Sequence, residues 1–212
     1  MHKFKYFFPE GFNKLITRLM SSKYRNRRID HNYETTNHNR ISLILKGISL
    51  FPIKSVKYLE IGCFKDEVFN SIPLLKNQKV GIDPEIGGTL RMTSCAFFYK
   101  NKEKFDVIFI DGLHHYEQVR KDIINAINAI NYDGIIFIHD MLPESKITSK
   151  VPRHKYASIW NGDVFRLIFD LFSVSFSVHP FLSVSVHVCV FLSVSVHLCV
   201  FLSVSVSFCL LL

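Results

Sequence analysis

Two aspartates stand directly after apolar runs, and three histidines lie close to them in the sequence. Asp111 ends the run FDVIFID, and Asp140 ends the run IIFIHD. The three histidines are His114, His115 and His139. Carboxylates and imidazoles exchange protons and bind cations, so these side chains are suited to acid–base or metal chemistry.

The segments around these residues predict how they are brought together. Residues 105–110 and 135–139 predict strands, and residues 116–130 predict a helix with one apolar stripe. Strands separated by a helix pair in parallel, and the C-terminal ends of parallel strands meet at the ligand-binding edge of a sheet. We therefore expect Asp111 and Asp140 to face one crevice.

Two earlier segments predict further strands that end in functional residue types. The run YLEIG places Glu60 and Gly62 at the end of one strand, and the run KVGID places Asp83 at the end of the next. Glycine lets the backbone approach a ligand closely. An acid at the end of the second strand can accept hydrogen bonds from ribose hydroxyls. The alternative for Asp83 is a turn-forming aspartate before Pro84.

The rest of this region continues the alternation of helices and strands. Helices are predicted at residues 39–51, 64–72, 97–104 and 164–171, and strands at residues 56–62, 79–83 and 89–93. Almost all of these strands are apolar, as in a parallel sheet that helices cover on both faces. The sequence thus predicts a Rossmann-like α/β domain over residues 39–171.

Charge and composition divide the chain into three parts. Residues 1–40 hold 9 Lys/Arg against 3 Asp/Glu, and residues 171–212 hold no charged side chain. Residues 1–38 are interpreted as a basic, partly disordered leader, with no nucleic-acid-binding module and no signal-peptide pattern. The five cysteines show no CxxC spacing. These features favour a reduced, cytoplasmic protein without a specific nucleic-acid partner.

Residues 172–212 contain a tandem decamer. The copies read PFLSVSVHVC, VFLSVSVHLC and VFLSVSVSFC. Alternating valine and serine is a strand pattern and a poor helix pattern, so a membrane span is not expected. Uncharged segments of high β-propensity also tend to aggregate, which allows self-association through the repeat. We interpret these residues as a degenerate, low-complexity terminus without a predicted fold.

The α/β part resembles the class I S-adenosylmethionine-dependent methyltransferases. The likeness is to the small-molecule O-methyltransferase-like branch, which has an I-D-G-x-H-x-Y motif after the fourth strand. It covers about residues 40–170, and its most specific part is the block IDGLHHYE. The other matching segments are YLEIGC, KVGIDPE, RMTS-x-x-FF, GIIFIHDMLP and WNGDVF.

The resemblance implies a role for each candidate residue. Glu60 and Gly62 would lie beside the methionine portion of S-adenosylmethionine, and Asp83 would hold the ribose. Adenine would be contacted near Ser94. Asp111, with the neighbouring His114, would face the sulfonium and the acceptor substrate.

The sequence departs from the family pattern in three places. Relatives commonly have an acid near Cys95, where adenine is contacted, and this chain has Ser94-Cys95-Ala96 there. The glycine-rich loop E-x-G-x-G-x-G keeps only its first glycine, because Phe64 and Asp66 occupy the other two glycine positions. The repeat stands where the family's terminal antiparallel hairpin would complete the sheet. We therefore expect that hairpin to be missing and the edge of the fifth strand to be open.

The resulting function prediction is O-methylation of a small-molecule hydroxyl. His114 and Asp111 are the predicted catalytic residues, and the alternative for His114 is a buried histidine that fixes its loop. Asp111 and Asp140 could hold a divalent cation such as Mg²⁺, which would lower the pKa of the acceptor hydroxyl. The alternative is a non-catalytic methyltransferase remnant. A nicotinamide-dependent oxidoreductase is disfavoured because no GxGxxG follows the first strand.

Overall fold

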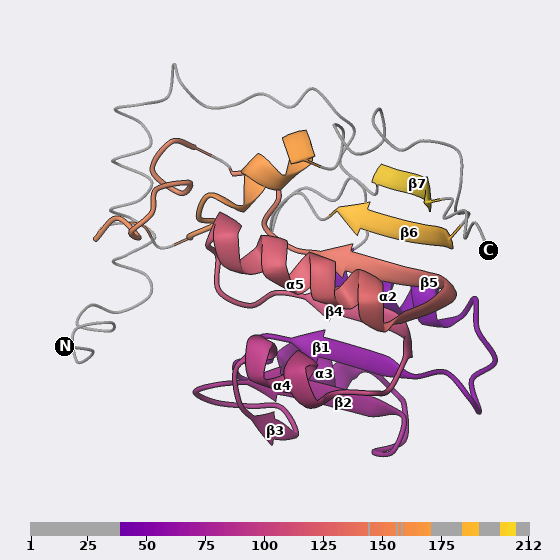
Figure 1. Cartoon of the computed structure of the whole chain (residues 1–212). Helices are drawn as coiled ribbons and strands as arrows, with labels where there is room; N and C mark the ends of the chain where they lie inside the picture. Colours follow the sequence, from indigo (N-terminus) through magenta and orange to yellow (C-terminus); the bar gives the residue numbers. More distant parts are fainter. Residues whose placement is uncertain are drawn as a thin grey trace.

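The described part of the chain folds around one sheet. The structure is a computed structural model that describes residues 39–143, 145–155, 157, 159–170, 184–190 and 200–206, the last two ranges by their backbone only. The strands lie in the order β3-β2-β1-β4-β5-β6-β7 (Figure 1). They are β1 Tyr58–Ile61, β2 Lys79–Asp83, β3 Leu90–Arg91, β4 Phe105–Ile110, β5 Ile130–Ile138, β6 Val184–Val190 and β7 Val200–Val206. The predicted leader at residues 1–38 lies outside the described residues.

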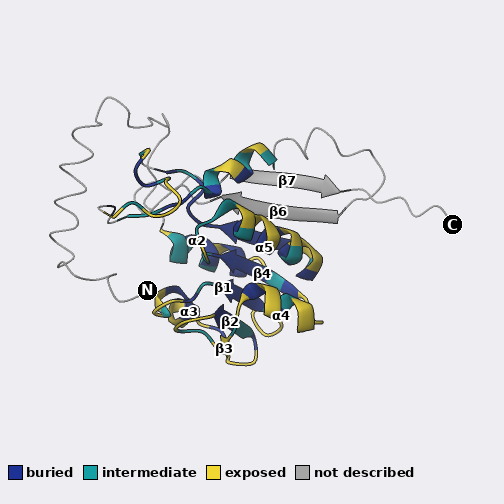
Figure 2. Cartoon of the chain, turned by 60° about the vertical axis from the view of Figure 1, so that its left-hand side comes forward, coloured by how far each residue is buried: buried dark blue, intermediate teal, exposed yellow. Residues whose placement is uncertain are grey.

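Strands β1 to β5 pair in parallel, which confirms the predicted Rossmann-like α/β class. The connecting elements are α2 Arg40–Ile48, α3 Glu67–Ser71, α4 Ser94–Lys100, α5 Tyr116–Ala129 and the 3-10 helix η2 Val164–Arg166. Helix α2 begins at a capping box. The Ser42 amide donates to the Asn39 side-chain oxygen, and the Asn39 amide donates to the Ser42 hydroxyl. These helices bury their apolar faces on the sheet, and Figure 2 shows exposed residues along their outer sides.

The sheet has an apolar core on each face. On one face, helices α2 and α3 pack Ile44 and Phe69 against residues such as Phe109. On the other face, helices α4 and α5 pack Phe97 and Ile123 against a different set of strand residues. Because successive side chains of a strand point to opposite faces, the nearly continuous apolar strands supply both cores. The two cores hold the strand ends in place, and with them the site.

Two elements differ from their predicted bounds. Helix α4 begins at Ser94 rather than residue 97, because the Thr93 hydroxyl accepts a hydrogen bond from the Ala96 backbone and caps the helix. Strand β5 begins at Ile130 rather than residue 135, and it includes residues 131–134, whose sequence NYDG consists of turn-forming residue types. The register with β4 shifts there, and Asp133 has a φ of 57°. The turn residues therefore form an irregularity within a strand and do not precede it.

The expectation of an open edge on the fifth strand is wrong for the backbone. β6 pairs in parallel with β5 from Ile135 to Ile138, and β7 pairs antiparallel with β6. Both strands come from the decamer repeat, whose alternating β-branched residues favour extended backbone. The repeat thus supplies an antiparallel strand pair at the place where the sequence predicted none.

Candidate active site

The backbone continues the sheet's hydrogen bonding for one residue beyond the strands, and this fixes the site residues. The Gly62 amide donates to the Ile82 carbonyl, and the Asp111 amide donates to the Ile61 carbonyl, both at 2.8 Å. The His139 amide donates to the Ile110 carbonyl at 3.0 Å. The ends of β1, β4 and β5 are therefore tied to their neighbours at one edge of the sheet.

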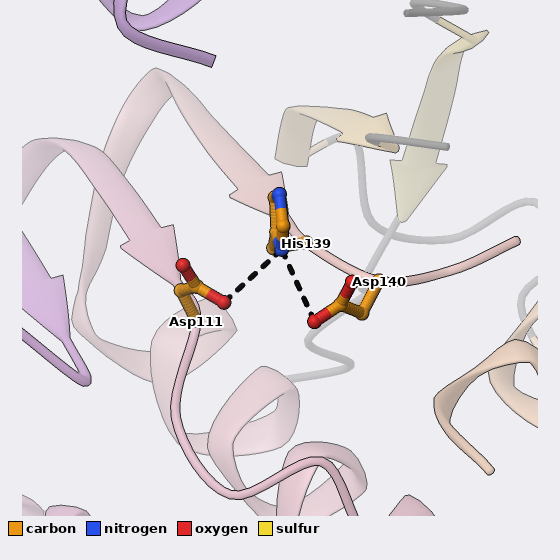
Figure 3. A group of neighbouring side chains, drawn as sticks. All are labelled: Asp111, His139 and Asp140. Atoms are coloured by element: carbon orange, nitrogen blue, oxygen red, sulfur yellow. Dashed lines mark ion pairs between the residues drawn. The ribbon is translucent and has the colours of Figure 1, made fainter. Parts of the chain in front are cut away.

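The structure brings Asp111 and Asp140 together around His139, as Figure 3 shows. His139 Nδ1 lies 3.1 Å from Asp111 Oδ1 and 3.2 Å from Asp140 Oδ2. Burial alone would lower the pKa of His139, but the two carboxylates outweigh it and raise the pKa to about 10. His139 is therefore a buried cation between two carboxylates at neutral pH. The sequence placed His139 near the site but gave it no role.

Asp111 carries a negative charge in this arrangement. Burial would raise its pKa, but the positive charge of His139 and hydrogen bonds from His114 and His139 hold the pKa well below its ordinary value. The carboxylate thus stays ionised throughout the physiological range.

His114 lies in contact with both aspartates. Its Nδ1 is 3.1 Å from Asp140 Oδ2 and hydrogen-bonds to the Trp160 carbonyl, while its Nε2 is 3.6 Å from Asp111 Oδ1. The ring stacks on the Trp160 indole, with 5.3 Å between centroids. Burial opposes the charged imidazole, but the Asp111 and Asp140 carboxylates raise the pKa of His114 above its ordinary value. The contact with Trp160 is also the kind of contact that a loop-fixing histidine would make.

The loop at residues 160–163 supports this histidine and its aspartate. Asn161 Nδ2 donates to Asp140 Oδ1 at 2.7 Å, and Asp163 Oδ1 accepts from the Tyr116 amide at 2.7 Å. A Cβ on Gly162 would lie 1.7 Å from the His114 carbonyl oxygen, so only glycine permits this approach. The sequence signal for this loop was the short run WNGD. It was part of the resemblance to the methyltransferases, but no role was predicted for its residues.

Arg40 is a second residue that the sequence did not place in the site. Its Nη1 lies 3.5 Å from Asp111 Oδ2, and its Nη2 lies 3.2 Å from Glu67 Oε2. It stands at the start of α2, 71 positions before Asp111, and no motif marks it. Only packing of α2 on the sheet could reveal this contact.

Glu60 is buried on β1 with 1% of its surface exposed. The Tyr58 hydroxyl donates to Glu60 Oε2 at 2.6 Å. Burial raises the pKa of Glu60 to about 8, and the hydrogen bond from Tyr58 opposes this only in part. Glu60 is therefore mainly uncharged at pH 7, which the sequence pattern does not reveal.

Gly62 is required by its neighbours. Its φ is 90°, and a Cβ there would lie 2.2 Å from the Asp111 carbonyl oxygen. The next two positions of the family's glycine-rich loop also have positive φ here: 48° at Phe64 and 61° at Asp66. The loop thus keeps a glycine-type backbone without the glycines.

Asp83 joins two loops at the end of β2. Its Oδ2 accepts from the Phe64 amide at 2.9 Å, and its Oδ1 accepts from the amides of Glu85 and Ile86 at 2.8 and 2.9 Å. This is the geometry of the turn-forming alternative. A carboxylate oxygen can accept a second hydrogen bond, so ribose binding at Asp83 stays a prediction.

Ser94 is buried, and its hydroxyl has partners within the protein. The hydroxyl donates to Asp122 Oδ1 at 2.6 Å, and Gln118 Nε2 donates to the same oxygen at 2.9 Å. Burial raises the pKa of Asp122. Ser94 therefore links α4 to α5, and its predicted contact with adenine stays a prediction.

Comparison with known protein families gives a match to part of the chain. Residues 84–141 match the model of a family described as a methyltransferase domain. The matched segment includes Ser94, Asp111, His114, His139 and Asp140, and it begins just after Asp83. The match supports a methyltransferase domain and, with it, a transferase activity. No curated protein matches the chain. Among the described residues, no helix has the length and apolar character that a membrane span needs.

Proposed function

We propose that this chain is an S-adenosylmethionine-dependent methyltransferase that acts on the hydroxyl of a small molecule. The observation that carries the proposal is the pairing of His114 with Asp140 at the ligand-binding edge of a Rossmann-like sheet. Both residues fall within the segment that matches a methyltransferase domain. Removal of a hydroxyl proton requires a positioned base, and His114, held by Asp140 beyond the end of β5, is such a base.

The residues at the strand ends fit the methyl donor. Gly62 and its positive-φ loop leave backbone where a side chain would otherwise stand, and the ionised Asp111 favours a nearby positive charge. When bound, S-adenosylmethionine would supply a methyl group on a cationic sulfonium. Glu60 and Gly62 would hold its methionine portion, Asp83 its ribose, and Ser94 would border its adenine.

His114 would take the proton of the acceptor hydroxyl on Nε2. Asp140 and the Trp160 carbonyl both lie at Nδ1, so that nitrogen carries the proton of the neutral ring and Nε2 is left as the base. Asn161 holds the other oxygen of Asp140, which fixes the carboxylate that orients the ring. Such general-base help is typically worth about 10²- to 10⁴-fold in rate.

A divalent cation is the second arrangement that these side chains allow. One ligand atom from each of Asp111, His139 and Asp140 lies within 4.8 Å of the others. Two carboxylates and an imidazole fit a transition ion better than Mg²⁺, which prefers oxygen ligands. His139 already places a positive charge between the carboxylates, and a cation would have to displace its proton. We therefore base the proposal on His114 and treat the cation as the competing arrangement.

Calorimetric titration with S-adenosylmethionine tests the proposal directly. The full chain should bind the compound, and Asp83→Ala should abolish binding, whereas Glu85→Ala should bind like the wild type because its side chain is exposed. Thermal unfolding checks that both variants are folded. A folded wild-type chain that binds neither S-adenosylmethionine nor its demethylated product would refute the proposal. Binding without turnover on any small hydroxyl compound would instead support the non-catalytic remnant.

A further inference from the structure

The guanidinium of Arg40 reaches the part of the sheet edge where β1 and β4 end. Its Nη1 lies 3.5 Å from Asp111 Oδ2. Its positive charge also acts on the carboxyl of Glu60. The side chain is 28% exposed, so it is accessible to solvent and is not sealed in the core.

Within the described part of the chain, Arg40 pairs with Glu67 and Asp111, and neither contact is strong. Glu67 has 74% of its side chain exposed, and an ion pair with so exposed a group contributes little. The contact with Asp111 is longer than the roughly 2.7–2.9 Å of a charge-assisted hydrogen bond, and the other oxygen of Asp111 faces His139. A guanidinium has five donors in a planar fork that matches a carboxylate, so Arg40 has donors left for a ligand.

The order of strands shows which part of a ligand would meet Arg40. Along the edge, β2 carries Asp83, β1 carries Glu60, and β4 leads to Asp111. A nucleoside held at Asp83 with its base toward Ser94 would extend its other substituent along β1 toward β4. In S-adenosylmethionine that substituent is an α-amino acid, which has one carboxylate and one ammonium group.

We propose that Arg40 binds the α-carboxylate of the methionyl group and that Glu60 accepts the α-ammonium. The inference rests on the proposed cofactor and assigns to the site a carboxylate-binding residue that the sequence did not suggest. The guanidinium is complementary to the carboxylate of an amino acid. The Glu60 carboxyl has a pKa of about 8, and a bound ammonium would favour its ionised form, which complements the second charge. Tyr58 occupies only Oε2 of Glu60, which leaves Oε1 to accept from the ammonium.

Two adenosine thioethers separate this role from any general effect of Arg40. S-adenosylhomocysteine carries the amino-acid group, and 5′-methylthioadenosine lacks it. The wild type should bind S-adenosylhomocysteine more tightly in calorimetry. Arg40→Gln should weaken that binding by about 10- to 100-fold, the size expected for a charged hydrogen-bonding pair, and leave 5′-methylthioadenosine within about twofold. Arg40→Lys should show an intermediate loss, because an ammonium cannot form the fork.

Glu67→Gln is the matched control, because it removes the other ion-pair partner of Arg40 and should preserve the ratio of the two affinities. Equal losses for both thioethers in the Arg40 variants, or no loss for either, would overturn the inference. So would a wild type that binds the two compounds equally, a result that leaves the cofactor assignment intact. A wild type that binds neither compound refutes the proposed function itself. If Arg40→Gln is unfolded by thermal scan, Arg40→Lys decides by the same ratio.

Discussion

His114 is the side chain whose protonation most directly sets the proposed reaction. It must be neutral to accept a proton, and its carboxylate neighbours raise its pKa above the ordinary 6.5. The rate of methyl transfer should therefore rise with pH, with a midpoint above 6.5. His114→Gln should lower kcat by about 10²-fold or more and remove this pH-dependent limb. Steady-state rates from pH 5 to 9 measure both effects.

The same variant distinguishes a base from a loop-fixing histidine. If His114 serves only to hold the Trp160 carbonyl, His114→Gln would lower the free energy of unfolding and leave the shape of the pH profile unchanged. Urea unfolding of the variant provides that comparison. An unaltered pH limb in an active, folded variant would contradict the assignment of the base.

The charges around His139 predict that methyl-transfer activity does not depend on an added metal ion. Its pKa of about 10 keeps it protonated between the two carboxylates at neutral pH, where a divalent cation would otherwise bind. Turnover should therefore survive dialysis against EDTA, and Mg²⁺ or Mn²⁺ should not increase it more than about twofold. Loss of activity in EDTA that Mn²⁺ restores would favour the Asp111–His139–Asp140 cation site instead. Asp140→Asn would then abolish the restoration.

Glu60 should make stability depend on pH. Its pKa is about 8 in the folded chain and 4.5 as the ordinary value. At pH 4 both states hold the proton, and the residue contributes no difference. Above pH 4.5 the unfolded chain loses the proton while the folded chain keeps it, so stability falls as pH rises and levels off above about pH 8. The penalty is fully present only above the folded pKa.

Glu60→Gln removes this penalty and can still accept the hydrogen bond from Tyr58. The variant should match the wild type at pH 4 and exceed it by roughly 2–4 kcal/mol at pH 9, since one pKa unit is worth about 1.4 kcal/mol. Urea unfolding over this range measures the difference. As a control, Glu85→Gln alters an exposed side chain, and its difference in free energy of unfolding from the wild type should not change with pH. If the difference in free energy of unfolding between Glu60→Gln and the wild type were the same at all pH values, burial would not hold Glu60 neutral.

The loop after β1 carries conformational strain that a glycine would relieve. A left-handed backbone at a non-glycine residue costs about 1–2 kcal/mol, and the φ of Phe64 is 48°. Phe64 is 51% exposed, so truncating it loses little packing. Phe64→Gly should therefore raise the free energy of unfolding by roughly 0.5–1 kcal/mol, after the entropic cost of glycine is subtracted.

Tyr99→Gly is the matched control for Phe64→Gly. It also removes an exposed aromatic ring, 90% exposed in this case, but from a helical position in α4. Glycine within a helix should lower the free energy of unfolding by about 1 kcal/mol. Chemical denaturation should thus give opposite signs for the two variants. A destabilised Phe64→Gly would mean that the ring packs more than its exposure indicates.

Most elements could be predicted because each has a local signal. β2 and β4 have the predicted bounds, since apolar runs between turn residues are sufficient to define them. Helix α5 was predicted within one residue. Its predicted apolar stripe was Val119, Ile123, Ile127 and Ile130, and all of these but Ile127 are buried. Asp122 and Ala126 are buried, and Ile127 is 41% exposed. The partners of a helix, which sequence periodicity does not specify, decide which side is buried.

The candidate site was predictable only where strand ends define it. Asp111 and Asp140 follow apolar strands, so their convergence could be inferred from topology, and the structure brings them together. Arg40 and Asn161 reach the site from a helix and a loop, and no spacing in the sequence links them to the aspartates. The neutral state of Glu60 depends on burial, which is a property of the assembled fold.

The sheet includes two strands from the repeat. β6 pairs with Ile135–Ile138 at the end of β5, next to the residues that carry His139. Deleting residues 171–212 should expose that edge, lower the urea midpoint and reduce affinity for S-adenosylmethionine. Deleting only residues 207–212, which follow β7, should leave both unchanged. An equally stable long deletion would show that the pairing contributes nothing to the domain. Self-association through the repeat stays a prediction, which sedimentation of the full chain can measure.

The partner strand of β5 is drawn from a unit that recurs every ten residues. β6 reads VSVHVCV, and residues 194–200 read VSVHLCV, a single substitution away. A chain that gained or lost one decamer would still offer β5 nearly the same strand, followed by more or fewer residues. The strand beside β5 is thus specified by a repeated sequence and not by a unique segment. Variation in copy number would alter the length of the protein and leave the position beside β5 filled.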